Sequence, residues 1–486
     1  MQELKIHDTA SRSKIQFVPL VDGKISIYVC GLTVYDLPHI GHARTFVVFD
    51  VFRKFLKKIG YDVTFVRNHT DIDDKIIRRS KEENTSPEEL ATRMIDALHA
   101  DMASIDVDEA DIEPRVTQHI PDIIAFIQKL FDNGYAYEAG GDVYYRVSAF
   151  KDYGKFSHRN LDEMLNGVRI DVNEAKENAG DFALWKGEAD PDKPAWDSPW
   201  GRGRPGWHIE CSCMSTKYLT PSFDIHGGGR DLIFPHHENE IAQAKGAQNG
   251  DFARHWMHVG MVEINGEKMS HSLKNFWTVR DIAKQVHPEA LRYFFLTTHY
   301  RNNINFSHDT IHEATQRITS LYRTLDAADR LLAPAIAKDP SLDANNDAIQ
   351  ALVTPFVDAM ADDLNTPKAL AIMAQVAKQA NEIIDAKGKK KPEKLKELIA
   401  CRKALQLMGD HCGLFARTPE TALLQLRNNA VKRLNLNVDE IEKLLAERTQ
   451  ARADKNWAVS DEIRDKLAQM GVNVLDRPEG STWQVD

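Results

Sequence analysis

Residues 25–66 of the chain read ISIYVCGLTVYDLPHIGHARTFVVFDVFRKFLKKIGYDVTFV, and this stretch predicts a strand, a helix and a second strand in that order. Its first six residues alternate and carry β-branched and aromatic side chains, which is typical of a strand. Residues 38–60 space their apolar side chains at helical intervals, and residues 63–66 form a strand pattern after a turn at Gly60. Such a β-α-β unit predicts a parallel sheet with a right-handed crossover, in which ligands gather at the carboxyl ends of the strands.

The sequence changes character twice after this unit. Residues 120–205 contain a helix, a hairpin-like segment and a loop rich in Asp, Pro, Gly and Trp, which we interpret as an insertion between two halves of a nucleotide-binding fold. After about Asn305 the apolar spacing is uniformly helical and predicts a helical bundle. A Thr-Pro-Glu-Thr stretch near Thr418 then separates the bundle from a small C-terminal unit, in which the sequence predicts two helices followed by a hairpin.

We therefore predict an α/β fold with three domains. A Rossmann-type parallel-sheet catalytic domain spans 1–314, with a connective insertion at 120–205 and a loop region at 262–285. A helical bundle follows at 315–415, and a small C-terminal α+β unit spans 416–486.

Composition excludes several classes of protein. The 486 residues contain no uninterrupted apolar run of about 18 residues, and the N-terminus has no signal-peptide core. We therefore expect a cytoplasmic protein with no membrane association, and we expect it to be a monomer. Five scattered cysteines do not form a disulfide framework, so we expect reduced thiols.

A formal net charge of −10 argues against non-specific nucleic-acid binding but leaves room for local basic strips. One concentration of lysines lies around Pro392, at Lys387, Lys389, Lys390, Lys391, Lys394 and Lys396. It is compatible with a strip that contacts RNA and with a solvated connection between helices.

Four side chains in the first half of the chain can surround one metal ion: Cys30, Cys211, His236 and Glu240. Zinc accepts thiolate, imidazole and carboxylate ligands, and a helix would place His236 and Glu240 on one face. Cys213 competes with Cys211, because positions two apart point to different sides and only one of them can easily face the metal. Each residue also has a structural interpretation, such as core packing for Cys30.

Two short motifs accompany this set. His39-Ile40-Gly41-His42 and Lys268-Met269-Ser270-His271-Ser272 resemble the HIGH and KMSKS signatures of class I aminoacyl-tRNA synthetases. The blocks CGLTVYDLPHIGHARTFVVFD, FVRNHTDIDDKII, DFALWK, GRPGWHIECS, DIHGGGRDLIFPHHENEIAQ and DDLNTPKAL resemble cysteinyl-tRNA synthetases, in the order of that family. The resemblance extends to the final WQVD and so covers nearly the whole chain.

This resemblance implies an activity and its site residues. The expected reaction is ATP-dependent activation of L-cysteine to cysteinyl-adenylate, followed by transfer to the 3'-terminal adenosine of tRNA(Cys), with magnesium accompanying ATP and one zinc ion sensing the substrate thiol. The resemblance assigns zinc to Cys30, Cys211, His236 and Glu240, and catalysis to His39, His42, Lys268 and His271. It assigns ATP binding to His39, Gly41, His42, Lys268, Met269, Ser270 and His271, amino-acid binding to Gly31, Thr70, Trp207, His226 and Asp231, and anticodon binding to Arg452, Lys455, Trp457 and Asp461. Core packing is the alternative for both Trp207 and Trp457.

The second motif departs from the family pattern, because His271 stands where KMSKS has its second lysine. An unperturbed imidazole is mostly neutral at pH 7, whereas a bound triphosphate favours its charged form. We therefore expect amino-acid activation to fall as the pH rises through the range in which His271 loses its proton. The alternative is that Lys268 alone suffices.

Two other functions compete with this interpretation. A cysteine:amino-sugar ligase of thiol-cofactor synthesis would share the metal set and the activation chemistry, but that family lacks a C-terminal anticodon unit. A non-catalytic zinc protein that binds RNA would not need His39, His42 and Lys268, which are all present.

Overall fold

The structure is a computed structural model that describes every residue except 1, 160–175, 249, 269–275, 478–479 and 486. Its internal contacts divide the chain into two units. Unit 1 comprises Met1–Val279, Thr298–Asn305 and Val357–Ala369, and unit 2 comprises Arg280–Thr297, Phe306–Phe356 and Leu370–Asp486. The domain boundaries given above stay predictions.

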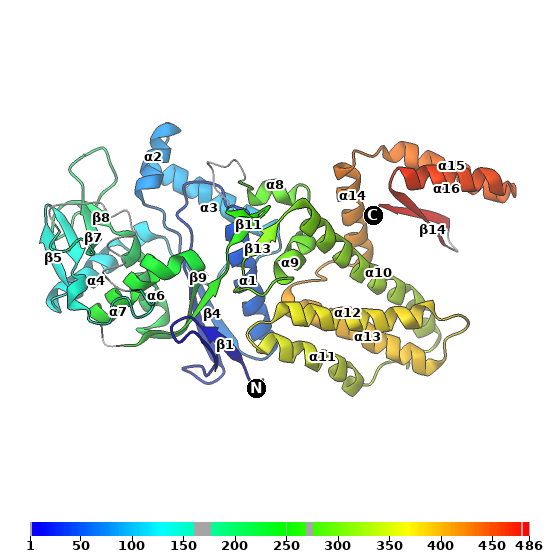
Figure 1. Ribbon diagram of the computed structural model, residues 1–486, viewed down its shortest axis with the longest axis horizontal. Coiled ribbons are helices and arrows are strands. Elements are labelled where there is room, and N and C mark those ends of the chain that lie inside the picture. Colours follow the sequence, from blue (N-terminus) through cyan, green and yellow to red (C-terminus); the bar gives the residue numbers. More distant parts are fainter. Residues whose placement is uncertain (1, 160–175, 249, 269–275, 478–479, 486) are drawn as a thin grey trace. The chain divides into compact units, whose positions relative to one another are not determined.

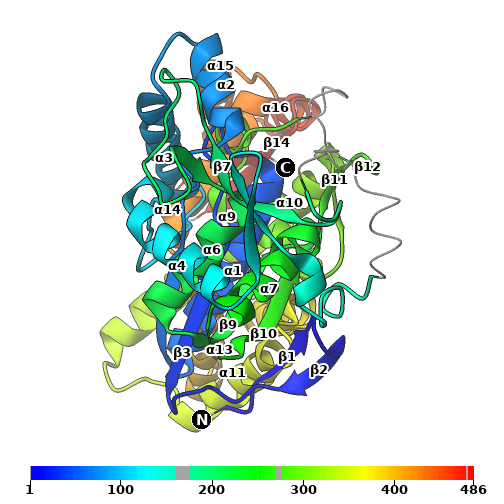
Figure 2. The ribbon, with the colours of Figure 1, turned by 90° about the vertical axis from the view of Figure 1, so that its left-hand side faces the viewer.

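The centre of unit 1 is a parallel sheet of four strands in the order β10-β9-β3-β4, of which Figure 1 labels β4 and β9. Its strands are β3 (Lys24–Val29), β4 (Asp62–Arg67), β9 (Ser222–Gly229) and β10 (Phe252–Val259). Figure 2 shows β3, β9 and β10 side by side. The β-α-β unit is confirmed, and the strand order reverses between β3 and β9, which is where ligands bind in sheets of this kind.

Helix α1 (Ile40–Lys58) connects β3 to β4 and covers this sheet with its apolar face. Val47 and Phe49 are buried on that face, and Lys57 and Lys58 stand in the last turn, where positive charge complements the helix dipole. Phe49 contacts β9 so closely that a Cβ atom on Gly227 would lie 2.1 Å from the Phe49 ring. Glycine at 227 therefore lets α1 lie directly on the sheet.

The insertion contains more strand than the sequence indicates. It begins with α4 (Ile120–Asp132) and holds an antiparallel sheet in the order β5-β6-β7-β8. Those strands are β5 (Ala136–Ala139), β6 (Asp142–Tyr145), β7 (Phe182–Gly187) and β8 (Gly203–Pro205). The prediction of a loop after the hairpin-like segment is therefore wrong for β7 and β8. Strand β7 forms because it pairs with β6 and buries Trp185. Neither feature can be read from the local periodicity of the sequence.

The remaining elements of unit 1 frame the central sheet. They are β1 (Lys5–Asp8), β2 (Ser13–Gln16), α2 (Asp74–Glu82), α3 (Pro87–Ala103), α6 (Trp207–Leu219), α7 (Glu238–Ala247), β11 (Val262–Ile264), β12 (Glu267–Lys268) and β13 (Ile304–Phe306), whose last residue belongs to unit 2. Short helical turns occupy Val116–Gln118, Val147–Ala149, Arg230–Leu232 and Ile233–His237.

Unit 2 consists mainly of helices, which confirms the helical pattern read from the sequence. Its elements are α8 (Val279–Ala283), α9 (Pro288–Leu296), α10 (His308–Lys338), α11 (Asn346–Ala361), α12 (Thr366–Asp385), α13 (Pro392–Cys412), α14 (Pro419–Arg433), α15 (Val438–Ala453), α16 (Trp457–Gln469), β14 (Val472–Arg477) and β15 (Gly480–Val485); α8, α11 and α12 extend into unit 1. The lysines around Pro392 lie where α12 passes into α13, and most of them are exposed.

The segment near Thr418, which the sequence indicated as a boundary, forms the start of helix α14. Thr418 caps α14 by accepting a hydrogen bond from the Thr421 amide at 3.3 Å, and Pro419 occupies the first helical position, which proline favours. The C-terminal hairpin β14–β15 then pairs antiparallel, and Trp483 of β15 packs with Ile441, Leu445 and Leu467. The predicted two helices and hairpin are therefore present, together with a third helix, α14.

Among the described residues, no helix is both long and apolar enough to cross a membrane.

Candidate active site

Three separate segments meet at the point where the strand order of the central sheet reverses. Cys30 follows the last residue of β3, and Cys211 lies in the first turns of α6. His236 and Glu240 stand before and within α7. Their ligand atoms all lie within 4.8 Å of one another, and all four residues are buried. The structure thus brings together the whole set that was predicted as metal ligands.

Glu240 lies at the centre of this cluster. Its Oε1 atom is 3.1 Å from His236 Nε2 and accepts a hydrogen bond from Cys30 Sγ at 3.4 Å. The His236–Glu240 contact joins residues four apart, so the spacing read from the sequence does place both side chains on one face.

Charges of opposite sign compensate each other inside the cluster. Burial opposes ionisation of Cys211, but a hydrogen bond from Cys30 and the neighbouring His236 outweigh it and lower the pKa of Cys211 to about 6. Burial would also lower the pKa of His236, yet the charge of Glu240 raises it to about 10. Glu240 in turn has its pKa lowered to about 2, because His226 and His236 outweigh its burial. The thiolate of Cys211 and the carboxylate of Glu240 therefore lie beside the positive charge of His236 in a buried cluster. Buried anionic ligands of this kind are what a bound cation requires.

Further side chains orient the cluster. His208 Nδ1 lies 2.8 Å from His236 Nδ1, so the His236 ring presents Nε2 to Glu240. His226 Nε2 is 2.8 Å from the second oxygen of Glu240, and the His226 ring stacks on Trp256. Partners of this kind fix the rotamers of metal ligands and raise their basicity.

A second set of four overlaps the first, because Cys30 and Glu240 also lie within reach of His226 and His237. It has one thiol instead of two, and His237 already lies 2.8 Å from His258 through its Nδ1 atom. Since zinc favours soft thiolate ligands, the set with Cys211 fits it better. Cys213 belongs to neither set among the described residues, and burial raises its pKa to about 12.

Another group, His69, His99 and Glu113, lies elsewhere in unit 1 and was not anticipated. Glu113 accepts hydrogen bonds from both imidazoles, and its other oxygen lies 2.6 Å from Arg67. The Arg67 guanidinium already compensates the carboxylate, so this group is explained as an ion pair with two hydrogen-bond partners.

The HIGH motif forms the N-terminus of α1. His39 caps the helix, and its Nδ1 atom accepts hydrogen bonds from the amides of Gly41 at 3.1 Å and His42 at 3.3 Å. The amide groups of Gly41 and His42 are therefore not free donors at this helix start, because the imidazole of His39 already satisfies them.

This cap also determines which ring nitrogens can donate. His42 Nδ1 accepts from the His39 amide, and burial followed by the charge of His39 lowers the pKa of His42 well below its usual value. The two rings stack with centroids 3.5 Å apart. A neutral His39 or His42 with an accepting Nδ1 carries its proton on Nε2, so each ring presents an Nε2–H donor.

Arg44 is a buried residue of this region that sequence reasoning missed. Its Nη1 donates to the carbonyls of Gly260 and Met261 at 2.8 Å, and its Nη2 donates to that of Asn302 at 2.5 Å. Arg44 thereby ties α1 to the backbone that enters the hairpin β11–β12. Lys268 ends that hairpin, and Met269, Ser270 and His271 lie outside the described residues.

Two residues assigned to the amino acid neighbour the cluster: Gly31 follows Cys30 in the chain, and Thr70 contacts Glu210, which precedes Cys211. Thr70 is buried, and its hydroxyl donates to Glu210 Oε2 at 2.7 Å. Glu210 was not anticipated; burial raises its pKa well above the usual value. Gly31 has no room for a side chain, since a Cβ atom would lie 1.6 Å from the Asn68 carbonyl oxygen.

The other residues of this group differ in exposure. Trp207 is 40 % exposed, and its ring centroid lies 4.3 Å from that of His236, so it forms a wall beside the cluster and is not core. Asp231 is exposed in the turn Arg230–Leu232 that follows β9. His226 is fully buried, and its Nε2 atom lies 2.8 Å from Glu240 Oε2.

The residues assigned to the anticodon lie in unit 2. Trp457 begins α16 and is 58 % exposed, so the core alternative for it is wrong. Lys455 lies in the turn before α16 with a φ of 59°, and Asp461 is 3.4 Å from Arg464. Arg452 pairs with Asp476 of β14 at 2.8 Å, a partner that sequence reasoning missed.

Comparisons with known proteins agree with these features. Three families match: "tRNA synthetases class I (C) catalytic domain" over residues 16–316, "DALR domain" over 355–416 and "Cysteinyl-tRNA ligase anticodon binding domain" over 438–483. The "Cysteine--tRNA ligase" of Anaeromyxobacter dehalogenans (strain 2CP-C) is 48% identical over 99% of this chain and 100% of its own length. The protein of the same name from Trichlorobacter lovleyi is 46% identical over 99% of both chains.

Solved structures share the fold at low identity. The methionyl-tRNA synthetase of Mycobacterium tuberculosis, in complex with methionyl-adenylate, has a TM-score of 0.58 at 17% identity and covers 84% of this chain and 92% of its own. The leucyl enzyme (LeuRS) of Agrobacterium radiobacter K84, in a ternary complex with tRNA, has a TM-score of 0.56 at 11% identity, with 85% and 86% covered.

Proposed function

The chain belongs to the cysteinyl-tRNA ligase family, and from this premise we propose that it activates L-cysteine with ATP and transfers the cysteinyl group to tRNA(Cys). In the first step, a cysteine carboxylate oxygen attacks the α-phosphorus of ATP, and pyrophosphate leaves. In the second, a hydroxyl of the 3'-terminal adenosine attacks the carbonyl carbon of the adenylate, and AMP leaves.

The buried cluster of two cysteines, a histidine and a glutamate carries this proposal. We infer that Cys30, Cys211, His236 and Glu240 hold one zinc ion, because thiolates and an imidazole are the ligands zinc prefers. Zinc, when bound there, supplies a Lewis acid that prefers sulfur to a hydroxyl and lowers the pKa of a thiol. Cysteine would thereby be distinguished from serine by the chemistry of its side chain, without a second hydrolytic site.

Side chains of the protein position the remainder of the amino acid. Trp207 offers an apolar wall beside His236, and the exposed carboxylate of Asp231 can accept hydrogen bonds from the substrate ammonium. Gly31 and Thr70 line the approach at the ends of β3 and β4, where Thr70 is held by Glu210.

ATP would lie against the start of α1. His39 and His42 present Nε2–H donors there, and preorganised donors stabilise the charge that develops on phosphate oxygens. Gly41 would permit close approach of the nucleotide, with magnesium accompanying the triphosphate. The family resemblance adds Lys268, Met269, Ser270 and His271 to the residues that we propose for ATP binding.

The anticodon would be read on α16 and its flanking turn. Trp457 stays exposed in the free protein and offers a plane for base stacking, while Arg452, Lys455 and Asp461 supply donors and acceptors. We further propose that the protein acts in the cytoplasm as a monomer.

The test is a charging assay with purified tRNA, using cysteine and serine in parallel, with and without a chelator. We expect charging with cysteine alone, its loss after chelation and its recovery on addition of zinc. A lack of cysteine-dependent ATP–pyrophosphate exchange in the zinc-loaded protein would contradict the proposal. The cysteine:amino-sugar ligase is not favoured, because residues 438–483 match an anticodon-binding family.

A further inference from the structure

Three groups of metal-binding side chains occur among the described residues, and two of them share Cys30 and Glu240. The third consists of His69, His99 and Glu113 and has no member in common with the other two. One ligand atom from each of its members lies within 4.8 Å of the others. Two imidazoles and one carboxylate are the protein ligands of open zinc sites, in which water completes the coordination.

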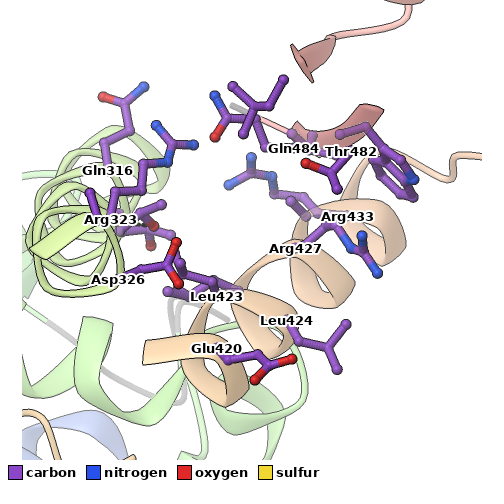
Figure 3. Close-up of a pocket in the computed structure, with 18 of the residues that line it drawn as sticks. Gln316, Arg323, Asp326, Glu420, Leu423, Leu424, Arg427, Arg433, Thr482 and Gln484 are labelled. Carbon is purple, nitrogen blue, oxygen red and sulfur yellow. Dashed lines mark hydrogen bonds between the residues drawn. The ribbon is translucent and has the colours of Figure 1, made fainter. Parts of the chain in front are cut away.

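The cavity of unit 2 provides no comparable set. It has a volume of about 730 Å³ and is lined by α10, α14 and the C-terminal hairpin, and Figure 3 shows side chains of both helices around it, among them Asp326 and Arg433. Asp326 pairs with Arg330 at 3.0 Å, and Arg433 donates to His312 Nδ1 at 3.2 Å. The described residues that line this cavity contain no three metal ligands within reach of one another.

The three members of the third group come from different segments of unit 1. His69 follows β4, and its backbone amide donates to the Pro114 carbonyl at 2.9 Å. His99 lies in the last turns of α3, and Glu113 lies in the segment that pairs with the residues after β4. His69 is buried, whereas 31 % of the His99 side chain is exposed. Solvent therefore reaches the group from the side of His99.

Both imidazoles direct their Nε2 atoms at the same oxygen of Glu113. The His69 Nε2 atom is 3.2 Å from Glu113 Oε2, and the His99 Nε2 atom is 2.7 Å from it. Two ligands of a tetrahedral zinc ion, each about 2.0–2.1 Å from the metal, lie about 3.3 Å apart. His69 and Glu113 already have this separation, so only the partly exposed His99 has to move outward, by a fraction of an ångström.

Neighbouring side chains hold the atoms of these ligands that face away from the shared oxygen. Glu113 Oε1 lies 2.6 Å from Arg67, and His99 Nδ1 lies 3.9 Å from the carboxylate of Glu109. Burial would raise the pKa of Glu113, but a hydrogen bond from His69 and the charge of Arg67 outweigh it and hold that pKa well below its usual value. Glu113 is therefore anionic at neutral pH, and partners of this kind orient metal ligands.

We propose that His69, His99 and Glu113 bind a divalent transition-metal ion such as zinc, with water as a further ligand, at a site separate from the cysteine cluster. Without a cation, the ion pair with Arg67 and two hydrogen bonds hold this group together. The site has no thiolate, and Arg67 compensates part of the Glu113 charge. The ion is therefore bound more weakly than in the cysteine cluster and exchanges with solvent. This inference does not depend on the proposed function.

A metal ion at this site would restrain the segment that carries two residues near the amino-acid site. Asn68 and Thr70 flank His69; Asn68 accepts a hydrogen bond from the Gly31 amide at 2.9 Å, and Thr70 donates to Glu210 at 2.7 Å. An ion bound to His69 and His99 would join this segment to α3. Because the unfolded chain does not hold the three ligands together, binding should raise the Tm.

The experiment is a cobalt titration of the unmodified protein and two variants. His99→Gln removes one ligand from a partly exposed position. His158→Gln is the matched control, because it removes an exposed histidine of unit 1 that belongs to none of the three groups. Cobalt bound by thiolates shows sulfur-to-metal charge-transfer absorption, whereas cobalt bound by imidazole, carboxylate and water does not, so the two sites are measured separately.

We expect the unmodified protein and His158→Gln to bind one equivalent of cobalt with thiolate absorption and a second equivalent without it. His99→Gln should keep the first and bind the second at least about 10-fold more weakly, because even the loss of an indirect partner of a metal ligand costs 10–100-fold in affinity. The second equivalent should raise the Tm of the unmodified protein and of His158→Gln but not that of His99→Gln.

Two outcomes would overturn the inference: no cobalt bound without thiolate absorption in the unmodified protein, or equal binding of that equivalent by all three proteins. Absence of the thiolate absorption would count against the proposed zinc cluster alone, because the other equivalent is measured without it. If His99→Gln does not fold, X-ray absorption of the second equivalent in the unmodified protein decides. Scattering from imidazole without sulfur supports the site, and scattering from sulfur overturns it.

Discussion

The cluster of proposed zinc ligands in unit 1 and the exposed face of α16 in unit 2, which we propose to read the anticodon, differ first in their exposure to solvent. Each of the four proposed zinc ligands is at most 6 % exposed, whereas Trp457 is 58 % exposed. A small amino acid can be enclosed, so its side chain can be tested by direct coordination in a buried site. An RNA base must arrive at the surface, so the aromatic ring that stacks on it has to remain accessible in the free protein.

The two regions also differ in how strongly their charged side chains interact, and the buried region again has the stronger effect. Burial within the cluster makes the Cys211, His236 and Glu240 charges depend on one another, and their pKa values are shifted accordingly. On α16 the exposed Asp461 and Arg464 form a surface pair of the kind that contributes little. Removing one side chain from the cluster should therefore cost far more function than removing one from the surface.

The largest effect is expected for Cys211→Ser. We expect loss of bound zinc and a decrease of more than about 100-fold in kcat/KM for cysteine activation, because even indirect partners of metal ligands change activity by 10–100-fold. Metal content and ATP–pyrophosphate exchange measure the two effects. Cys213→Ser is the matched control and should keep both, since Cys213 lies outside the cluster. Zinc retained in Cys211→Ser but lost in Cys213→Ser would reverse the assignment.

A smaller effect is expected for Trp457→Ala. Loss of one stacked base contact corresponds to about 1–3 kcal/mol, or roughly 5- to 150-fold in KM for tRNA(Cys), with cysteine activation unchanged. Steady-state aminoacylation at varied tRNA concentration measures it. Val459→Ala, another exposed apolar residue of α16, serves as control. If both variants aminoacylate normally, base reading does not take place on this face.

A change of a few fold is expected for His271→Lys, which tests the proposed role of His271 in ATP binding. Protonated His271 would stabilise pyrophosphate, so activation should fall as the pH rises above about 6.5 and the imidazole loses its charge. His271→Lys stays charged over this range and should flatten the profile. The measurement is ATP–pyrophosphate exchange between about pH 6 and 8.5; superimposable profiles would show that Lys268 suffices.

The smallest effect is expected for Asp476→Asn, which tests the ion pair that Asp476 of β14 forms with Arg448 of α15. Hydrogen bonding from Arg448 holds the pKa of Asp476 well below its unfolded value of 3.8. This stabilisation is present above about pH 4 and is lost as the pH falls through the folded pKa. Because Asp476 is partly exposed, we expect a loss of about 1 kcal/mol or less at pH 7, and none in strong acid. Thermal unfolding of both proteins across this pH range measures it; a constant difference at every pH would contradict the ion-pair explanation.

Local patterns were sufficient for the elements that depend on local backbone geometry. The alternation before Cys30 and the helical spacing after Pro38 correctly indicated β3, α1 and β4. The spacing of His236 and Glu240 likewise indicated a shared face. Strand β7 escaped prediction because its pairing with β6 crosses about forty residues of chain, and α14 escaped because its capping signal was interpreted as a separator.

By itself the sequence determined the β-α-β unit, the helical character of the C-terminal half, the family and the identity of the residues to be considered at each site. Only the tertiary structure decided that Cys211, and not Cys213, faces Cys30, that Arg44 joins α1 to the hairpin carrying Lys268, and that arginines of α10 and α14 share one cavity. The physical reason is that periodicity and capping constrain φ and ψ over a few residues. Distances between side chains far apart in the sequence depend instead on how buried surfaces pack, and no local pattern encodes them.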